Sequence, residues 1–118
     1  MYSAKLLDHF HHPRHVGEIP QAQHVVESQN PVCGDVLKLW VVVKDQTVQD
    51  ASFKAAGCVP AIACGSWLAE WIHGKNPSDL SLLSADRIEN ALDGLPPASK
   101  HAAVLACDAV KQLIEKLR

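Results

Sequence analysis

The sequence predicts an α+β fold, because strands and helices occupy separate parts of the chain. Three segments with strand patterns follow one another between residues 23 and 56, and the last two are joined by a tight turn. One helical pattern precedes this block, and helical patterns fill most of the chain after residue 60. Neighbouring strands with a short connection pair antiparallel, and helices grouped apart from such strands are typical of α+β proteins.

Length and composition are those of one globular domain over residues 1–118, with 47% apolar residues, 20% charged residues and a formal net charge of −2. This charge argues against a nucleic-acid partner. No apolar run approaches the ~20 residues that span a bilayer, and no export signal is recognisable, so we expect a cytoplasmic protein without a membrane partner. The four cysteines then indicate metal or thiol chemistry before disulfides.

Each expected element has a local reason. Ser3 and Ser84 are suited to cap helices, Asp45-Gln46 reads as a tight turn between strands, and Gly74 ends a helix. Alternating apolar residues from Leu37 to Val43 favour a strand. The expected elements are a helix over residues 3–11, strands over 23–29, 36–44 and 48–56, one helix over 60–73, one or two short helices over 79–92, and a last helix over 99–117.

The helix predicted over residues 60–73 has an apolar stripe that we expect to face the core. The stripe consists of Ala61, Cys64, Leu68, Trp71 and Ile72. Cys58 precedes this helix, where the positive end of the helix dipole favours thiolate over thiol. A thiolate held there can act as a nucleophile or as a metal ligand.

The predicted hairpin has a chemical consequence. Cys33 and Asp35 lie just before its first strand, and Cys58 lies just after its second. Antiparallel pairing therefore brings these residues together at one edge of the sheet. His101, at the start of the last helix, is a further candidate partner.

Two thiols, one carboxyl and one imidazole can fill a tetrahedral site for zinc or for the irons of a small cluster. The spacing of Cys33, Asp35, Cys58 and His101 fits no zinc finger. The alternative is equally open: both cysteines are buried small residues, the carboxyl accepts hydrogen bonds in a turn, and the histidine caps a helix.

Other cysteines and histidines are better explained by structure. Cys64 and Cys107 lie on the apolar stripes of their helices, which favours core packing over a second thiol pair or a sulfur-accepting relay. The cluster of His9, His11, His12 and His15 is interrupted by Pro13, so we interpret it as a solvated helix end and not as a metal site.

Several separate motifs, in order along nearly the whole chain, resemble the IscU/NifU-type iron–sulfur cluster scaffold family. They are Tyr2-Ser3, Asp8-His9, Pro13-Arg14-His15-Val16-Gly17, Cys33-Gly34-Asp35-Val36, Phe53-Lys54, Gly57-Cys58, Ala61-Ile62-Ala63, Glu70-Trp71-Ile72, Gly74-Lys75, and Leu95-Pro96-Pro97 with His101.

The resemblance implies a small three-stranded antiparallel sheet packed by helices on one side, with the site at one end of the sheet. It implies Cys33, Asp35, Cys58 and His101 as ligands of a [2Fe–2S] cluster or iron. Its implied partners are a cysteine desulfurase that delivers sulfur, acceptor proteins that receive the cluster, and an Hsp70-type chaperone. Such a protein is a scaffold and not an enzyme.

This chain departs from the family pattern in three places. The family has a cysteine directly after the histidine, where this chain has Ala102. The chaperone motif Leu-Pro-Pro-Val-Lys is replaced by Leu95-Pro96-Pro97-Ala98-Ser99. Val59-Pro60 follows Cys58 in place of Gly-Ser, which stiffens the loop around the thiol.

Three hypotheses follow. The first is a variant scaffold or carrier of a [2Fe–2S] cluster, and mixed ligation by thiolate and imidazole is known chemistry for such clusters. The second is a Zn²⁺ site made from the same four residues, with a structural or sulfur-transfer role. The third is a non-catalytic partner of a cysteine desulfurase that keeps the fold without the cluster chemistry.

Overall fold

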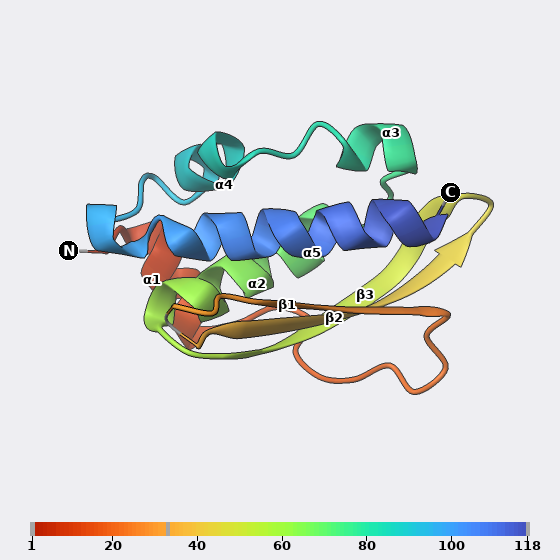
Figure 1. Ribbon diagram of the computed structural model, residues 1–118, viewed down its shortest axis with the longest axis horizontal. Coiled ribbons are helices and arrows are strands. Elements are labelled where there is room, and N and C mark those ends of the chain that lie inside the picture. The colour runs from red at the N-terminus through yellow and green to blue at the C-terminus, as the bar shows by residue number, and fades with distance from the viewer. Residues whose placement is uncertain (1, 33, 118) are drawn as a thin grey trace.

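The structure is a computed structural model that describes residues 2–32 and 34–117. Figure 1 shows that the helices lie on one side of the sheet, which confirms the predicted α+β arrangement. The elements described are α1 (Ala4–His11), β1 (His24–Gln29), β2 (Val36–Lys44), β3 (Thr47–Ala56), α2 (Val59–Trp71), α3 (Pro77–Leu80), α4 (Ala85–Ala91), the short 3-10 helix η1 (Pro97–Ser99) and α5 (His101–Leu117).

The sheet has the order β1-β2-β3, and both pairs are antiparallel. The turn between β2 and β3 consists of Asp45 and Gln46, whose φ angles of 55° and 63° are those of a hairpin turn that follows the strand twist. Val36 pairs with Ala56, so the start of β2 lies beside the end of β3. Residues just before β2 and just after β3 therefore emerge at the same end of the sheet.

The segment between α1 and β1 passes along the other side of the sheet (Figure 1). Val16 forms a parallel bridge with Phe53 on the outer edge of β3. The Phe53 N–H donates to the His15 carbonyl at 2.9 Å, and the Gly17 N–H donates to the Phe53 carbonyl at 2.9 Å. Residues 15–17, hereafter the edge segment, thus occupy hydrogen-bonding positions of β3.

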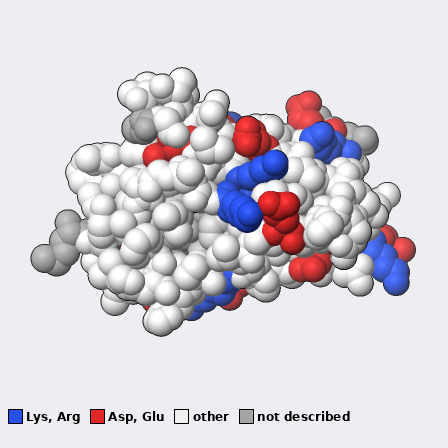
Figure 2. Space-filling model, turned by 90° about the horizontal axis from the view of Figure 1, so that it is seen from below, with Lys and Arg blue, Asp and Glu red and all other residues white. Residues whose placement is uncertain are grey.

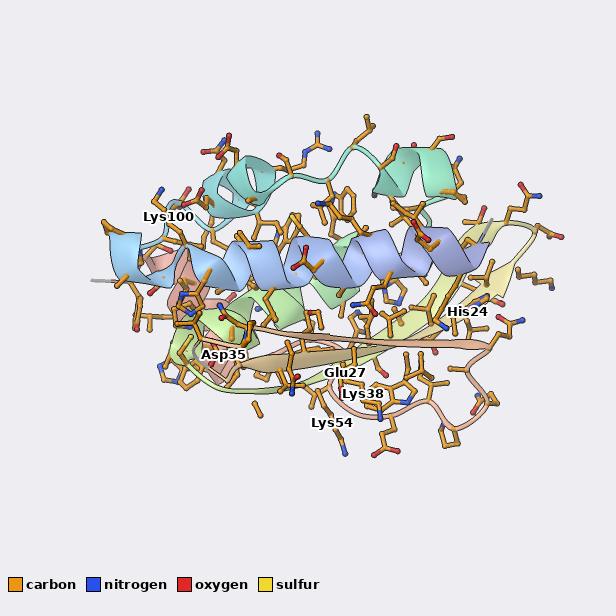
Figure 3. The ribbon with its side chains drawn as sticks, viewed as in Figure 1. His24, Glu27, Asp35, Lys38, Lys54 and Lys100 are labelled. Atoms are coloured by element: carbon orange, nitrogen blue, oxygen red, sulfur yellow. The ribbon has the colours of Figure 1, made fainter. Side chains whose placement is uncertain are left out.

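The face of the sheet away from the helices carries charged side chains. Lys38 and Lys54 project on this side (Figure 3). Figure 2 shows basic and acidic side chains next to one another on the surface seen from below, and Lys54 pairs with Glu18 at 3.0 Å. Basic side chains on this surface are therefore interspersed with acidic ones.

The apolar stripe predicted for α2 is confirmed at Ala61, Cys64, Leu68 and Ile72, which are buried. It is wrong at Trp71, which is partly exposed, and burial also extends beyond the stripe to other residues of the helix. The reason is that α2 packs against the sheet, α1 and α5 at once. Its buried residues are mostly small: Pro60, Ala61, Ala63, Cys64, Gly65, Ser66, Leu68 and Ala69.

Both predicted caps are confirmed, while several helix boundaries differ by one or two residues from expectation. Ser3 accepts a hydrogen bond from the Leu6 N–H at 3.0 Å, and Ser84 accepts one from the Arg87 N–H at 3.1 Å. The capping by Ser84 divides the predicted 79–92 segment into α3 and α4. The last helix begins at His101 because residues 97–99 form the tighter turn η1 directly after Pro96. No helix in the described part of the chain is long and apolar enough to cross a membrane.

Candidate metal centre

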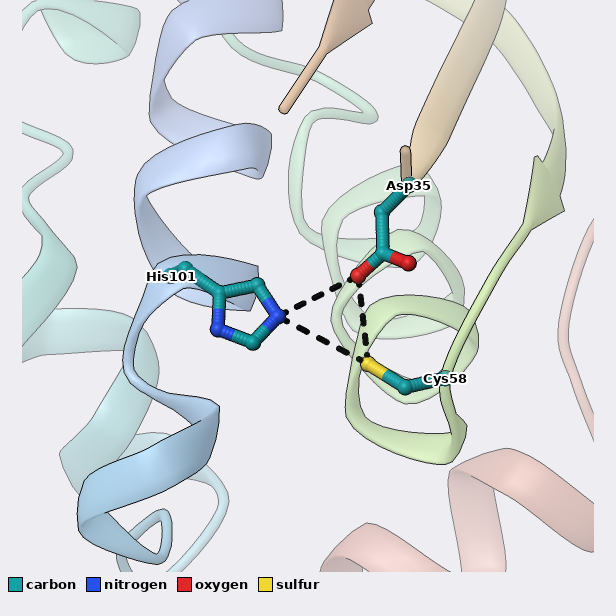
Figure 4. Close-up of side chains that lie close together, drawn as sticks. All are labelled: Asp35, Cys58 and His101. Atoms are coloured by element: carbon teal, nitrogen blue, oxygen red, sulfur yellow. Dashed lines mark hydrogen bonds and ion pairs between the residues drawn. The ribbon is translucent and has the colours of Figure 1, made fainter. Parts of the chain in front are cut away.

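Three side chains from three elements converge at one end of the sheet (Figure 4). The Asp35 Oδ2 lies 3.2 Å from the Cys58 Sγ and 3.2 Å from the His101 Nε2. The Cys58 Sγ and the His101 Nε2 are 3.9 Å apart. Asp35 is buried, with 4% of its surface exposed, while Cys58 and His101 are partly exposed. The carboxylate thus forms the inner wall of a site that opens to solvent beside the thiol and the imidazole.

The fold explains this convergence. Asp35 comes directly before β2 and Cys58 caps α2 directly after β3, so the hairpin register places both at one end of the sheet. His101 reaches the same end because α5 is fixed across β1. The Ser28 hydroxyl donates to the Leu105 carbonyl at 2.7 Å, and the Gln112 amide donates to the Glu27 carbonyl at 2.8 Å.

Gly57 makes room for the buried carboxylate. Its φ of 141° is a conformation that glycine adopts readily. A Cβ atom on this residue would lie 2.1 Å from the Asp35 Oδ1 and 2.6 Å from the Asp35 Cγ. Asp35 therefore packs directly against the Gly57 backbone, so the glycine before Cys58 is needed to make room for the carboxylate.

The prediction that the helix start favours a Cys58 thiolate is wrong for the protein without metal. Burial raises the pKa of the Cys58 thiol, and the neighbouring Asp35 carboxylate raises this pKa further, which outweighs the lowering by the Ala61 N–H. The thiol therefore stays protonated and donates a hydrogen bond to the Asp35 carboxylate. A bound cation would reverse this preference, because a coordinating thiol loses its proton.

The donor atoms suit a metal ion. Ligand atoms at 2.0–2.3 Å from a tetrahedral Zn²⁺ lie roughly 3.3–3.8 Å from one another. The three separations, 3.2, 3.2 and 3.9 Å, are close to that range. Among the described residues, Asp35, Cys58 and His101 are the only group of three or more His, Cys, Asp or Glu found close enough to share an ion. Their predicted convergence is confirmed; their role as ligands stays a prediction, and Cys33 lies outside the described residues.

Comparison with known proteins gives the family. The sequence model of the NifU-like N-terminal domain matches residues 1–118. The chain belongs to the NifU-like N-terminal domain family. The protein named iron–sulfur cluster assembly scaffold protein IscU 1 from Archaeoglobus fulgidus is 40% identical over 97% of this chain and 74% of its own length. The protein named iron–sulfur cluster assembly scaffold protein IscU from Escherichia coli K12 is 39% identical over 96% of this chain and 91% of its own length.

Solved structures agree with this NifU-like fold. An iron–sulfur cluster assembly scaffold protein for the SUF system from Fervidobacterium islandicum superimposes with a TM-score of 0.76 and 22% identity over 94% of both chains. The N-terminal part of a NifU-like protein from Brucella abortus gives a TM-score of 0.66 and 16% identity over 97% of this chain and 80% of that one. At these identities the likeness shows the fold alone.

The other two described cysteines of this NifU-like domain lie away from the three converging side chains. Cys64 is 1% exposed, and burial raises the pKa of its thiol to about 12. Cys107 is partly exposed on α5, and burial raises the pKa of its thiol as well. Both thiols are therefore poor nucleophiles, which favours packing over the sulfur-accepting relay.

The departures from the family pattern also have places in the structure. Ala102, which stands where the family has a cysteine, is fully buried in the core. Lys100 forms an ion pair with Glu89 at 2.9 Å. Neither Ala102 nor Lys100 is part of the group of Asp35, Cys58 and His101 that could share an ion.

The histidines near the N-terminus are only in part a solvated helix end. His11, His12 and His15 are exposed, but His9 is buried. The His9 Nδ1 lies 2.8 Å from the Ser66 Oγ, and the same hydroxyl accepts the Arg14 N–H at 2.9 Å. The interpretation is wrong for His9 because α1 turns this residue toward α2, which a single-helix pattern does not reveal.

Proposed function

We propose that this protein is an iron–sulfur cluster assembly scaffold or carrier. It binds a [2Fe–2S] cluster or iron through Cys33, Asp35, Cys58 and His101 and passes it to acceptor proteins. The observation that carries the proposal is the convergence of Asp35, Cys58 and His101 in a chain about 40% identical to proteins named as IscU scaffolds. The cluster is cargo, and the protein is not an enzyme.

The donor set fits transient binding. A thiolate is a strong ligand for iron and an imidazole can replace a thiolate, whereas a carboxylate is exchanged more easily. Asp35 also lies 3.2 Å from the Cys58 thiol, so both donors can face one ion once the thiol has lost its proton to solvent. Release to an acceptor protein would then begin at the carboxylate ligand.

The proposal includes partners. Sulfur must reach the site from a donor, which for the family that this chain resembles is the persulfide of a cysteine desulfurase. The partly exposed Cys58 thiol is the sulfur acceptor within the site, since Cys64 is buried and Cys107, although partly exposed, lies outside the site. Contact with an Hsp70-type chaperone is the weaker part of the proposal, because only Leu95-Pro96-Pro97 remains of the motif.

A second candidate is a Zn²⁺ site with a structural or sulfur-transfer role. The observation that favours it is the spacing of the three donor atoms, which suits a single tetrahedral ion. Zinc would hold Cys58 as thiolate, and two thiolates and one carboxylate around Zn²⁺ would leave a net charge of −1. This candidate uses the same residues, so only the metal content separates the two.

The experiment is anaerobic reconstitution with iron and sulfide, followed by metal and acid-labile sulfide analysis and a visible spectrum. We expect a cluster chromophore that is lost in Cys58→Ser and kept in Cys107→Ser, a matched control at a partly exposed thiol outside the site. A chromophore that survives Cys58→Ser contradicts the ligand assignment. Stoichiometric zinc that iron and sulfide cannot displace supports the second candidate.

A further inference from the structure

The loop that leads into Asp35 is closed by hydrogen bonds at Asn30. The Asn30 N–H donates to the Asp35 carbonyl at 2.8 Å, and the Asn30 carbonyl accepts the Gly34 N–H at 2.7 Å. The Asn30 side chain acts in the same loop, because its Oδ1 accepts the Val32 N–H at 3.0 Å. Asn30 thus forms hydrogen bonds to the end of the loop through its main chain and to the first turn of the loop through its side chain.

Asp35 is held from two directions. The Asn30 contacts fix its main chain on one side, and Gly57 packs against its carboxylate on the other. The position of Asp35 matters because its Oδ2 contacts both the thiol and the imidazole, which are 3.9 Å apart from each other. A small shift of this carboxylate would break two of the three contacts at once.

We infer that Asn30 is a positioning residue for Asp35. Its side chain holds the turn from Asn30 to Val32 ahead of Asp35, so that the carboxylate stands between the thiol and the imidazole before any metal arrives. A ligand whose position is fixed in advance loses less conformational freedom on binding, so the affinity for a cation is higher. This role rests on the proposed function, because it serves the binding of the cargo.

The test compares Asn30→Ala with Asn76→Ala. The Asn76 Oδ1 accepts the Asp79 N–H at 2.9 Å, so the control removes the same kind of side-chain contact at the start of α3. Co²⁺ is the probe, followed by its thiolate absorption. Loss of one such hydrogen bond corresponds to about a fivefold change in an equilibrium. We expect about fivefold weaker Co²⁺ binding in Asn30→Ala and unchanged binding in Asn76→Ala.

Amide hydrogen exchange tests the loop without any metal. The Gly34 amide should exchange about fivefold faster in Asn30→Ala, and Asn30→Asp, which keeps the acceptor oxygen, should restore the slower rate. Unchanged exchange in Asn30→Ala, or faster exchange with unchanged Co²⁺ affinity, overturns the inference.

Failure of the proposed function has a different signature. If the unaltered protein binds neither Co²⁺ nor iron, the proposed function is contradicted, and the position of Asp35 is then read from the ¹³C shift of its carboxyl carbon. A shift that moves in Asn30→Ala and not in Asn76→Ala supports the positioning role. A shift that stays in both variants overturns it.

Discussion

Gly65→Ala should destabilise the protein even though alanine favours helices. A Cβ atom at this position would lie 2.7 and 2.8 Å from two ring atoms of Phe53 and 3.0 Å from the Leu37 Cδ1. Ordinary contacts between carbon atoms are about 3.5–4.0 Å, so α2 would have to move away from the sheet by roughly 0.7–1 Å. Phe53 cannot easily give way, because it is 1% exposed and paired along both edges of β3.

The size of the effect follows from two opposing contributions. Overpacking in a core costs about 1–3 kcal/mol, and replacing glycine by alanine inside a helix gains about 1 kcal/mol. We expect a net loss of about 1 kcal/mol, which lowers the melting temperature by roughly 4 °C in a domain of this size. Urea unfolding followed by circular dichroism measures it.

A double-mutant cycle identifies the cause. In a Phe53→Leu background the ring is absent, so Gly65→Ala should be neutral or stabilising there, and the two substitutions should couple by about 1 kcal/mol or more. If Gly65→Ala alone raises the stability by the full helix propensity, the packing of α2 against the sheet is not as tight as the distances indicate.

Three further predictions concern polar groups that are buried or partly buried. Burial lowers the pKa of His9 from its ordinary value of 6.5, so the stability that His9 contributes is present above pH 6.5 and is lost as the pH falls through the folded pKa. The free energy of unfolding should therefore fall less between pH 7 and pH 5 in His9→Gln than in the unaltered protein. The pKa of the Cys58 thiol is raised, and a bound metal displaces its proton, so the Co²⁺ affinity should rise about tenfold per pH unit between pH 6 and 8 on account of this thiol. In Cys58→Ser the slope of the logarithm of this affinity against pH should drop by about one. A pH-independent affinity of the unaltered protein contradicts the prediction. Ser28→Ala leaves the packing intact but removes the bond to the Leu105 carbonyl, so urea unfolding should show a loss of about 1 kcal/mol, and no loss would mean that this bond does not fix α5.

The features predictable from sequence were those set by neighbours in the chain. The caps at Ser3 and Ser84, the turn at Asp45-Gln46, and the convergence of Asp35 with Cys58 follow from short spacings and one hairpin. These depend on local backbone chemistry and on strand pairing, which leave direct traces in the order of residues.

The features that were missed depend on contacts between distant segments. The raised pKa of Cys58 comes from burial and from Asp35, and the helix start alone predicts the opposite shift. The burial of His9 requires Ser66 on another helix. The small residues of α2 are the signal in the sequence that indicates close packing against several elements.

The edge segment at residues 15–17 has a consequence for association between chains. A short open sheet offers unpaired backbone groups at its outer strands, and these can recruit a strand from another molecule. Here Phe53 on β3 already exchanges hydrogen bonds with the chain's own residues 15 and 17. Growth of the sheet by strand addition is therefore blocked at this position, and the protein can expose Cys58 and His101 to partners without also offering them this part of the β3 edge.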